Sequence, residues 1–175
     1  LEMKGLGHAI LTGELLIGNQ PFGVVLADDL CFNEGPGVME QLVAIYRRTG
    51  NTVIAIEEVA EEDVGKFGIV AGEEVEPGLY RVTDMVEKPQ PDQAPSNLAI
   101  IGRYVLSPFI FELLRHTPAG KNGEIQLTDA LLALARTSKV LAYKFQGRRF
   151  DCGSVGGFVE TTNYVYQNVY QRGGR

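Results

Sequence analysis

Two adjacent carboxylates, Asp28 and Asp29, directly follow a short apolar run at residues 24–27. A short β-branched run of this kind predicts a strand that is buried on both faces, as in a parallel sheet. In an open α/β sheet, ligands bind beyond the carboxyl ends of the strands. Mg²⁺ is usually held by one or two carboxylates together with substrate phosphates. The stretch therefore fits a divalent metal site, but it also fits a plain turn in which the acids contact no ligand.

An acid, a base and a proline, Glu87-Lys88-Pro89, end another predicted strand. Pro89 cannot continue a central strand, and it should restrain the preceding Lys88 to extended geometry. Both charged side chains are then expected at a sheet edge beside a loop. A lysine there can hold a phosphate as a point charge, and a glutamate can accept hydrogen bonds from paired sugar hydroxyls. The alternative is a surface ion pair, which contributes little to stability.

Asp151 stands between a predicted strand and a helix whose N-cap residue is Ser154. An acid at this place can simply belong to the start of the helix. It can also supply a second metal carboxylate if the strand and the helix bring it near Asp28.

Two glycines occur where a ligand could approach the backbone closely. Gly7 lies in G-L-G-H (5–8), which resembles part of a phosphate loop but lacks the preceding strand of a dinucleotide site. A glycine can still let a flat base or a ribose lie against the main chain. Gly68 falls on a predicted strand, where a glycine marks either close ligand approach or a bulge.

The spacing of apolar residues predicts the elements that must position these groups. Helices are expected over 8–16, 36–49, 108–115, 128–135 and 154–170, and strands over 22–27, 52–56, 66–71, 79–86, 98–106 and 140–145. Thr128-Asp129 can cap the fourth helix, and Phe158, Thr162, Val165 and Val169 share one side of the last. The first strand, the helix after it and the next strand should form a right-handed βαβ unit. The pattern predicts one α/β domain over residues 1–175 with a mixed sheet.

Composition narrows the classes of partner. The chain has 175 residues, of which 45% are hydrophobic, and a net charge of −6. Scattered basic residues argue against binding to nucleic acid or to an anionic membrane, and no apolar run reaches the roughly 18 residues of a membrane helix. Cys31 and Cys152 have no metal or redox spacing, which favours a cytoplasmic location. No nucleophile motif or zinc-like cluster occurs, so the candidate chemistry involves metal, phosphate and sugar.

Seven segments taken together resemble the bacterial UTP–glucose-1-phosphate uridylyltransferase family. In chain order they are K-G-L-G-H-A (4–9), L-A-D-D (26–29), K-F-G-I-V (66–70), V-E-K-P (86–89), A-P-S-N-L-A-I-I-G-R-Y (94–104), G-E-I-Q-L-T-D-A (123–130) and F-D-C-G-S (150–154). The resemblance implies a Rossmann-like nucleotidyltransferase fold with a mixed central sheet flanked by helices. It also implies the reaction of UTP with α-D-glucose 1-phosphate to give UDP-glucose and pyrophosphate, with Mg²⁺ as cofactor.

The resemblance further implies roles for charged residues. It makes Asp28 a metal ligand and Asp151 the second metal carboxylate, whereas Asp29 stays outside the site because relatives vary there. It makes Lys88 the catalytic residue that holds the sugar phosphate. Because two polyanions must meet in this reaction, Lys88 and Mg²⁺ would screen their repulsion and hold the reacting geometry.

The substrate contacts are implied in the same way. Glu87 would bind glucose hydroxyls, and the backbone groups of Gly68 and Ile100 would touch the sugar. Gly7 would pack near the uracil of the nucleotide.

The chain departs from the family pattern at its start. Family members begin with a strand that leads into a Gly-rich triphosphate loop, G-x-G-T-R, and this motif does not occur in the sequence. We therefore expect an N-terminally incomplete domain that is inactive alone. Exposed sheet edges would make such a chain unstable or a homo-oligomer.

Three other interpretations remain. A response-regulator receiver domain also has an acid pair and a Lys-Pro, but it needs a phosphoacceptor Asp where the strand at 53–56 ends in Glu57-Glu58. A non-catalytic sugar-phosphate-binding module would bind glucose 1-phosphate without nucleotide. Thymidylyl- or adenylyl-transferring relatives are the nearest enzymes, although G-L-G-H-A and A-P-S-N-L-A favour the uridylyl branch.

Overall fold

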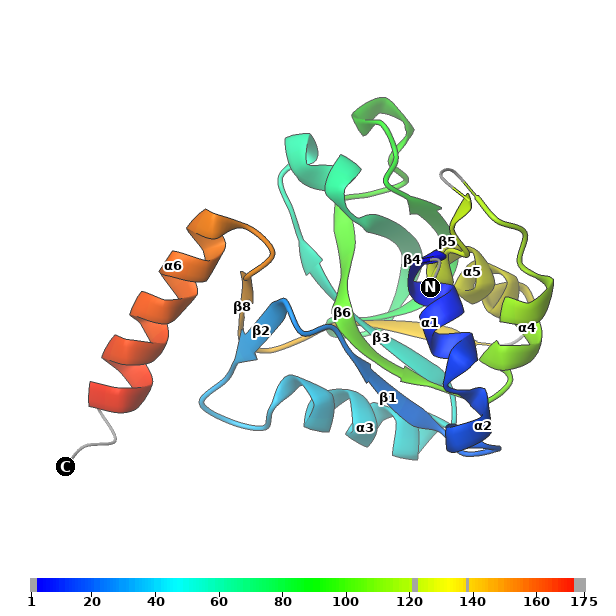
Figure 1. Ribbon diagram of the computed structural model, residues 1–175, viewed down its shortest axis with the longest axis horizontal. Helices are drawn as coiled ribbons and strands as arrows, with labels where there is room; N and C mark the ends of the chain where they lie inside the picture. Colours follow the sequence, from blue (N-terminus) through cyan, green and yellow to red (C-terminus); the bar gives the residue numbers. More distant parts are fainter. Residues whose placement is uncertain (1–2, 121–122, 138, 172–175) are drawn as a thin grey trace.

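The centre of the protein is a six-stranded sheet (Figure 1). Its strands are β1 (Phe22–Val25), β3 (Thr52–Glu58), β4 (Gly68–Glu76), β5 (Leu79–Glu87), β6 (Leu98–Leu106) and β7 (Val140–Lys144). They are ordered β1-β6-β3-β7-β5-β4. The computed structural model describes residues 3–120, 123–137 and 139–171.

The β4–β5 hairpin connects two separate parts of this sheet. Its β5 strand pairs with β7 through Leu79–Arg81, while the start of β4 pairs with β6 through Ile69 and Val70. The parallel pair among the described strands is β3–β7, and the other pairs are antiparallel. The start of β4 therefore lies between the end of β5 and the start of β6. Glu87 and Lys88, at the end of β5, lie next to this part of the sheet.

Helices cover both faces of the sheet and make a three-layer structure (Figure 1). The helices of these layers are α1 (Gly5–Thr12), α2 (Glu14–Ile17), α3 (Val38–Thr49), α4 (Ile110–His116) and α5 (Leu127–Thr137). One face is covered by α3, whose buried residues Val38, Leu42 and Ile45 follow the helical spacing of an apolar stripe. The other face packs against α1, α4 and α5. None of the helices in the described part of the chain is long and apolar enough to span a membrane.

A second, two-stranded sheet lies beside the main one (Figure 1). It pairs β2 (Asp29–Phe32) with β8 (Arg148–Asp151), and α6 (Val155–Val165) follows, continued by a π-helical turn at Tyr166–Tyr170. The rings of Phe32, Phe150 and Tyr164 pack together with centroids 4.7–5.7 Å apart. These rings hold α6 to the small sheet. Short 3₁₀ helices also lie at Glu61–Lys66 and Pro91–Gln93.

The predicted mixed α/β fold is confirmed, but the predicted surroundings of the first strand are wrong. β1 is an edge strand that pairs antiparallel with β6, and Val25 is 55% exposed. β1 and β3 run in the same direction, yet β6 lies between them. Four apolar or small residues predict a strand well, but they do not specify how many faces its neighbours cover.

The predicted closing helix at 154–170 is present as α6 and its π-helical continuation. The side that carries Phe158 and Val169 faces outward, with these residues 60% and 48% exposed, whereas Tyr164 and Thr161 pack inward. The inward side is set by the ring cluster on β2 and β8, two strands that the apolar pattern did not predict.

Candidate functional site

A polar cavity of about 420 Å³ opens where the start of β4, the end of β5 and the middle of β6 meet the first turn of α5 and the β2–β8 pair. Six residues predicted for the site line this cavity, namely Asp28, Gly68, Glu87, Lys88, Ile100 and Asp151. The fold thus brings together groups that are up to 123 positions apart in the sequence (151 − 28). Gly7 does not line the cavity, although Gly5 and Leu6 do.

Glu87 lies at the end of β5, directly opposite Gly68 of β4. Its Oε2 accepts a hydrogen bond of 2.6 Å from Thr128 Oγ1. A Cβ atom at position 68 would lie 3.1 Å from this carboxylate oxygen and 3.2 Å from Ile100 Cδ1. The strand register is regular at Gly68 and shifts only further along, between Ala71 and Gly72 and near Glu74. Gly68 therefore keeps space open beside the carboxylate rather than marking a bulge.

Lys88 has a positive φ of 45°, which corrects the expectation of extended geometry. Its amide donates a hydrogen bond of 2.9 Å to Phe67 O, so the chain turns back onto the segment before β4. A non-glycine residue in this region of φ costs of order 1–3 kcal/mol and is found mostly at functional sites. Among the residues that the structure describes, the Lys88 ammonium group has no acidic partner. It remains available for a ligand on the cavity rim.

Asp28 and Asp151 come close together around Gly153. A Cβ atom on Gly153 would lie 3.0 Å from Asp151 Oδ1 and 3.4 Å from Asp28 Oδ2, so both carboxylates flank one point. The Gly153 amide donates to Asp151 Oδ1 at 2.9 Å, and the Cys152 amide donates to Asp28 O at 2.7 Å. These backbone bonds fix the second carboxylate beside the first.

This pair of acids fits Mg²⁺. Both offer hard oxygen ligands, and magnesium in proteins commonly takes one or two carboxylates together with phosphate oxygens and water. The described residues hold no group of three or more His, Cys, Asp or Glu side chains arranged for a metal. The two carboxylates would therefore need ligands from the substrate, as magnesium sites in phosphate chemistry usually do.

The start of α6 is built around Asp151. Ser154 is the N-cap and its hydroxyl accepts a hydrogen bond from the Gly157 amide at 3.1 Å, as the sequence predicts. A Cβ on Gly157 would lie 1.8 Å from Asp151 O, which no side chain allows. Ser154 and Gly157 together let the helix begin directly after Asp151.

Asp29 has a structural role at the base of the cavity. Its side chain is buried, and its Oδ2 accepts a hydrogen bond of 2.9 Å from the Gly102 amide. Its Oδ1 pairs with Arg149, whose Nη1 also lies 2.8 Å from Glu57 Oε1. Burial lowers the pKa of Arg149, but the two carboxylates outweigh it and raise this pKa above its usual value. The cluster ties β2 and β8 to the main sheet and so supports the segments that carry Asp28 and Asp151.

Tyr104 contributes a buried phenol to the cavity wall. Burial raises the pKa of this phenol well above its ordinary value, and the nearby charges of Glu87 and Asp29 raise it further. Tyr104 is therefore neutral throughout the physiological range.

Gly7 serves close packing in this structure. Its amide donates a hydrogen bond of 3.0 Å to Ile125 O, and a Cβ would lie 2.6 Å from the same oxygen and 2.9 Å from Leu114 Cδ2. Gly7 therefore holds α1 against the segment that leads into α5, and its contact with a nucleotide base stays a prediction.

Several residues at the cavity were not among the site residues predicted from the sequence. They are Lys66, Tyr104, Glu124, Gln126, Thr128 and Arg149. All but Arg149 lie inside segments that carry the family resemblance, which is a usable signal. Thr128 lies in the first turn of α5 and bonds across to Glu87, so the expectation that it caps the helix is wrong.

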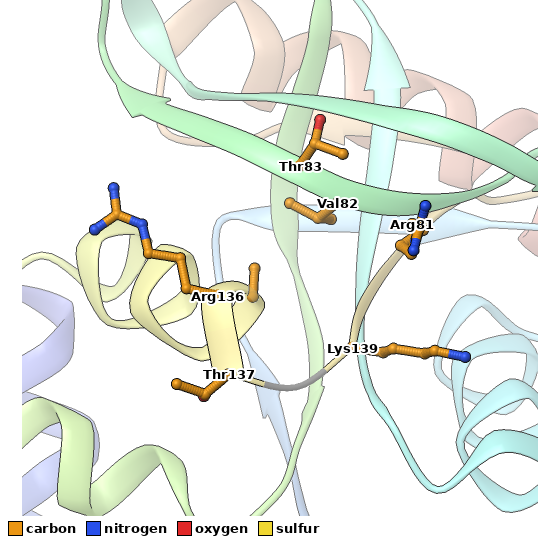
Figure 2. Close-up of a pocket in the computed structure, with 7 residues that line it drawn as sticks. Arg81, Val82, Thr83, Arg136, Thr137 and Lys139 are labelled. Atoms are coloured by element: carbon orange, nitrogen blue, oxygen red, sulfur yellow. The ribbon is translucent and has the colours of Figure 1, made fainter.

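A second hollow of about 470 Å³ lies at the other end of α5 (Figure 2). It is lined by basic residues, Arg81, Arg136 and Lys139, together with Val82, Thr83, Ala135 and Thr137. Arg81 is paired with Glu73 at 2.5 Å, and Figure 2 shows the side chains of Arg136 and Lys139 extending in opposite directions. These groups do not converge on one ligand, so the polar cavity is the better site.

The fold and the cavity define a class of protein. A family model described as "Nucleotidyl transferase" matches residues 1–168. The chain belongs to this family.

Particular relatives narrow the class further. The chain is 57% identical over 174 residues to UTP–glucose-1-phosphate uridylyltransferase of Pseudomonas aeruginosa, covering 99% of this chain and 62% of that protein. It is 47% identical over 161 residues to the enzyme of the same name from Staphylococcus epidermidis, covering 92% and 56%. These relatives confirm the resemblance stated from the motifs. The chain spans 62% or less of the length of these relatives.

Solved structures agree with the sequence relatives. A UDP-glucose pyrophosphorylase complexed with UDP-glucose superposes with a TM-score of 0.93 at 55% identity, covering 95% of this chain and 64% of the other. A putative glucose-1-phosphate thymidylyltransferase from Bacillus anthracis has a TM-score of 0.76 at 17% identity, which is a likeness of fold alone. The nucleotidyltransferase family also removes the receiver-domain alternative.

Proposed function

We propose that this chain provides the sugar-phosphate and metal sites of a UTP–glucose-1-phosphate uridylyltransferase. The reaction joins UTP and α-D-glucose 1-phosphate into UDP-glucose and releases pyrophosphate. One observation carries the proposal: Glu87 and Lys88 lie on the rim of the cavity that Asp28 and Asp151 also line. The names of the relatives at 57% and 47% identity support the choice of substrates.

The proposed chemistry follows from the charges of these groups. Glu87 accepts hydrogen bonds from glucose hydroxyls, and Lys88 holds the sugar phosphate as a point charge. The phosphate oxygen then attacks the α-phosphorus of UTP in line and pyrophosphate leaves, so no covalent nucleophile is needed. Bound Mg²⁺ would neutralise phosphate charge that builds up during the transfer. Asp28 and Asp151 would hold this ion, while Lys88 fixes the attacking group in a reactive geometry.

Further properties belong to the same proposal. The backbone of Gly68 and of Ile100 would touch the sugar, and Gly7 would lie near the uracil. We also infer a homo-oligomer that works in the cytoplasm. The uridylyl branch is preferred over a thymidylyl relative because the similarity at high identity is to uridylyltransferases, whereas the thymidylyltransferase structure is only 17% identical.

Calorimetric titration of the 175-residue chain tests the proposal. With Mg²⁺ present, glucose 1-phosphate should bind saturably, and Lys88→Met should weaken it by about tenfold or more, because a charge-assisted contact contributes about 1.5–3 kcal/mol. The matched control is Lys139→Met, which removes an exposed lysine outside the cavity. Failure of the wild-type chain to bind glucose 1-phosphate would contradict the proposal.

A second titration with UTP tests whether this chain also binds the nucleotide. Binding of both ligands supports the uridylyltransferase assignment and excludes a pure sugar-phosphate module, whereas binding of glucose 1-phosphate alone fits both that module and an enzyme part without the G-x-G-T-R loop. A pyrophosphate-release assay on material with a verified mass of 19.1 kDa then decides whether this chain turns over by itself.

A further inference from the structure

Thr128 makes a contact that the proposed chemistry does not yet use. Its side chain is in the first turn of α5, and the residue is 7% exposed. Its hydroxyl donates to Glu87 Oε2 over 2.6 Å, and the two residues are 41 positions apart. This short bond joins the helix to the end of β5 at the cavity wall.

The hydroxyl bonds a partner outside its own helix. Threonine further along a helix can bond a backbone carbonyl of the preceding turn, as Thr49 does to Ile45 O at 2.9 Å, but Thr128 stands in the first turn of α5, which no helical turn precedes. Thr128 instead directs its single hydroxyl proton to a side chain on another element. A bond to an ionised carboxylate is roughly twice as strong as one between neutral groups.

The strand opposite Glu87 leaves room for the bond. A Cβ on Gly68 would lie 3.0 Å from Thr128 Oγ1 and 3.1 Å from Glu87 Oε2, tighter than ordinary contact. The absence of a side chain at Gly68 therefore keeps the pair undisturbed and open to the cavity.

The bond also leaves the carboxylate able to accept further donors. An ionised carboxylate has about four lone-pair sites on its two oxygens. Thr128 occupies one of those on Oε2, so three remain for sugar hydroxyls. Without a partner, the glutamate side chain would sample several rotamers, and binding a sugar would have to restrict them.

We propose that Thr128 is a positioning residue that fixes the Glu87 carboxylate in the orientation that accepts the sugar hydroxyls. This inference rests on the proposed function, because it assigns the sugar to Glu87. It adds a residue from the G-E-I-Q-L-T-D-A segment to the sugar site.

Three variants of the full chain test the inference. Thr128→Val removes the hydroxyl at nearly constant volume, and Thr128→Ser keeps it. Thr52→Val is the matched control, because Thr52 is 2% exposed, its Oγ1 accepts a hydrogen bond from the Ser107 amide at 3.1 Å, and neither residue lines the cavity. The two readouts are the Kd for glucose 1-phosphate with Mg²⁺ and the position of the Glu87 side chain in crystal structures.

The expected result is a loss of affinity that serine rescues. Thr128→Val should raise the Kd about tenfold, equivalent to about 1.4 kcal/mol, and should leave Glu87 in more than one rotamer. Thr128→Ser should bind like wild type, and Thr52→Val should lose stability without losing affinity. An unchanged Glu87 with an unchanged Kd in Thr128→Val would overturn the inference.

The two readouts also separate this inference from the proposed function. If wild type binds no glucose 1-phosphate, the proposed function fails, and the crystal structures still decide the positioning. Disorder of Glu87 in Thr128→Val then supports Thr128 as its holder, whereas a fixed Glu87 overturns that role.

Discussion

At the scale of single residues, backbone conformation places the charged groups as much as their chemical type does. Glu87-Lys88-Pro89 predicts charged side chains at a sheet edge beside a loop, and in the structure Glu87 and Lys88 line the polar cavity. The positive φ of Lys88 was not predictable, because Pro89 disfavours the right-handed region without selecting between the remaining ones. The bond from the Lys88 amide to Phe67 O settles the choice, and that partner is 21 positions away (88 − 67).

The conformation of Lys88 leads to a prediction about stability. Glycine tolerates positive φ, whereas a Cβ there costs roughly 1–2 kcal/mol. Lys88→Gly should therefore be about 1 kcal/mol more stable than Lys88→Ala, although both lose the ammonium group and bind glucose 1-phosphate poorly. Urea denaturation of the two variants measures the difference. Equal stability, or a more stable alanine variant, would contradict the strained conformation.

The buried phenol of Tyr104 leads to a prediction about alkaline pH. Burial, with Glu87 and Asp29 adding to it, raises its pKa above the ordinary 10.0. The neutral phenol is therefore retained in the folded state after the unfolded chain has ionised. The resulting stability is complete below pH 10 and is lost as the pH rises further, at up to about 1.4 kcal/mol per pH unit. Tyr104→Phe should show a shallower decline in urea midpoint above pH 10 than wild type, and parallel curves would count against the buried phenol.

The proposed metal site of Asp28 and Asp151 leads to a third prediction at this scale. Asp28→Asn and Asp151→Asn should each weaken Mn²⁺ binding, measured by electron paramagnetic resonance, by at least about tenfold. Asp92→Asn is the control, because Asp92 is exposed in a short 3₁₀ helix away from the cavity. The pairing of Asp28 with Asp151 would be disproved by variants that bind Mn²⁺ as tightly as the control does.

At the scale of elements, strong apolar patterns predicted the main strands and helices, while contacts distant in sequence decided the rest. The expected strand at 98–106 has the same bounds as β6. The β2–β8 pair was missed because its segments, D-L-C-F and R-R-F-D, carry charges that do not resemble a buried strand. Those charges are satisfied by the cluster of Asp29, Arg149 and Glu57, whose members are up to 120 positions apart. The contact of Thr128 with Glu87 was also missed, because the two residues are 41 positions apart in the sequence.

The close approach of β6 to the turn that carries Asp28 predicts a glycine at which substitution is costly. A Cβ on Gly102 would lie 2.5 Å from Leu26 Cβ and 2.6 Å from Asp29 Oδ2. Gly102→Ala should therefore destabilise the protein by about 1–3 kcal/mol and weaken Mn²⁺ binding, because the turn with Asp28 must shift. Gly156→Ala is the control, since nothing lies near a Cβ in that turn of α6; it should raise stability by up to about 1 kcal/mol. If Gly102→Ala is as stable as wild type, β6 and the turn at residues 26–29 are not tightly packed.

At the scale of the whole molecule, the acidic chain carries an apolar surface on its last helix. The main sheet and its two helical layers enclose the core, while α6 stands to one side with the small sheet (Figure 1). Val155, Phe158, Tyr166 and Tyr170 are 60–86% exposed there. Exposed apolar patches of this kind commonly mark contacts with another protein surface.

The apolar surface of α6 predicts self-association in solution. Light scattering coupled to gel filtration should give a mass above the 19.1 kDa of one chain. The double variant Val155→Lys, Phe158→Glu should shift the mass toward one chain without loss of the folded spectrum. A wild-type chain that elutes at 19.1 kDa would contradict the inferred homo-oligomer.

The most direct test of the account is a crystal structure of the chain with glucose 1-phosphate and Mn²⁺. The account predicts an anomalous peak between the carboxylates of Asp28 and Asp151, sugar hydroxyls on Glu87 and the phosphate at Lys88. Sugar phosphate bound elsewhere, for example among Arg81, Arg136 and Lys139, with no anomalous peak at the two aspartates, would contradict it.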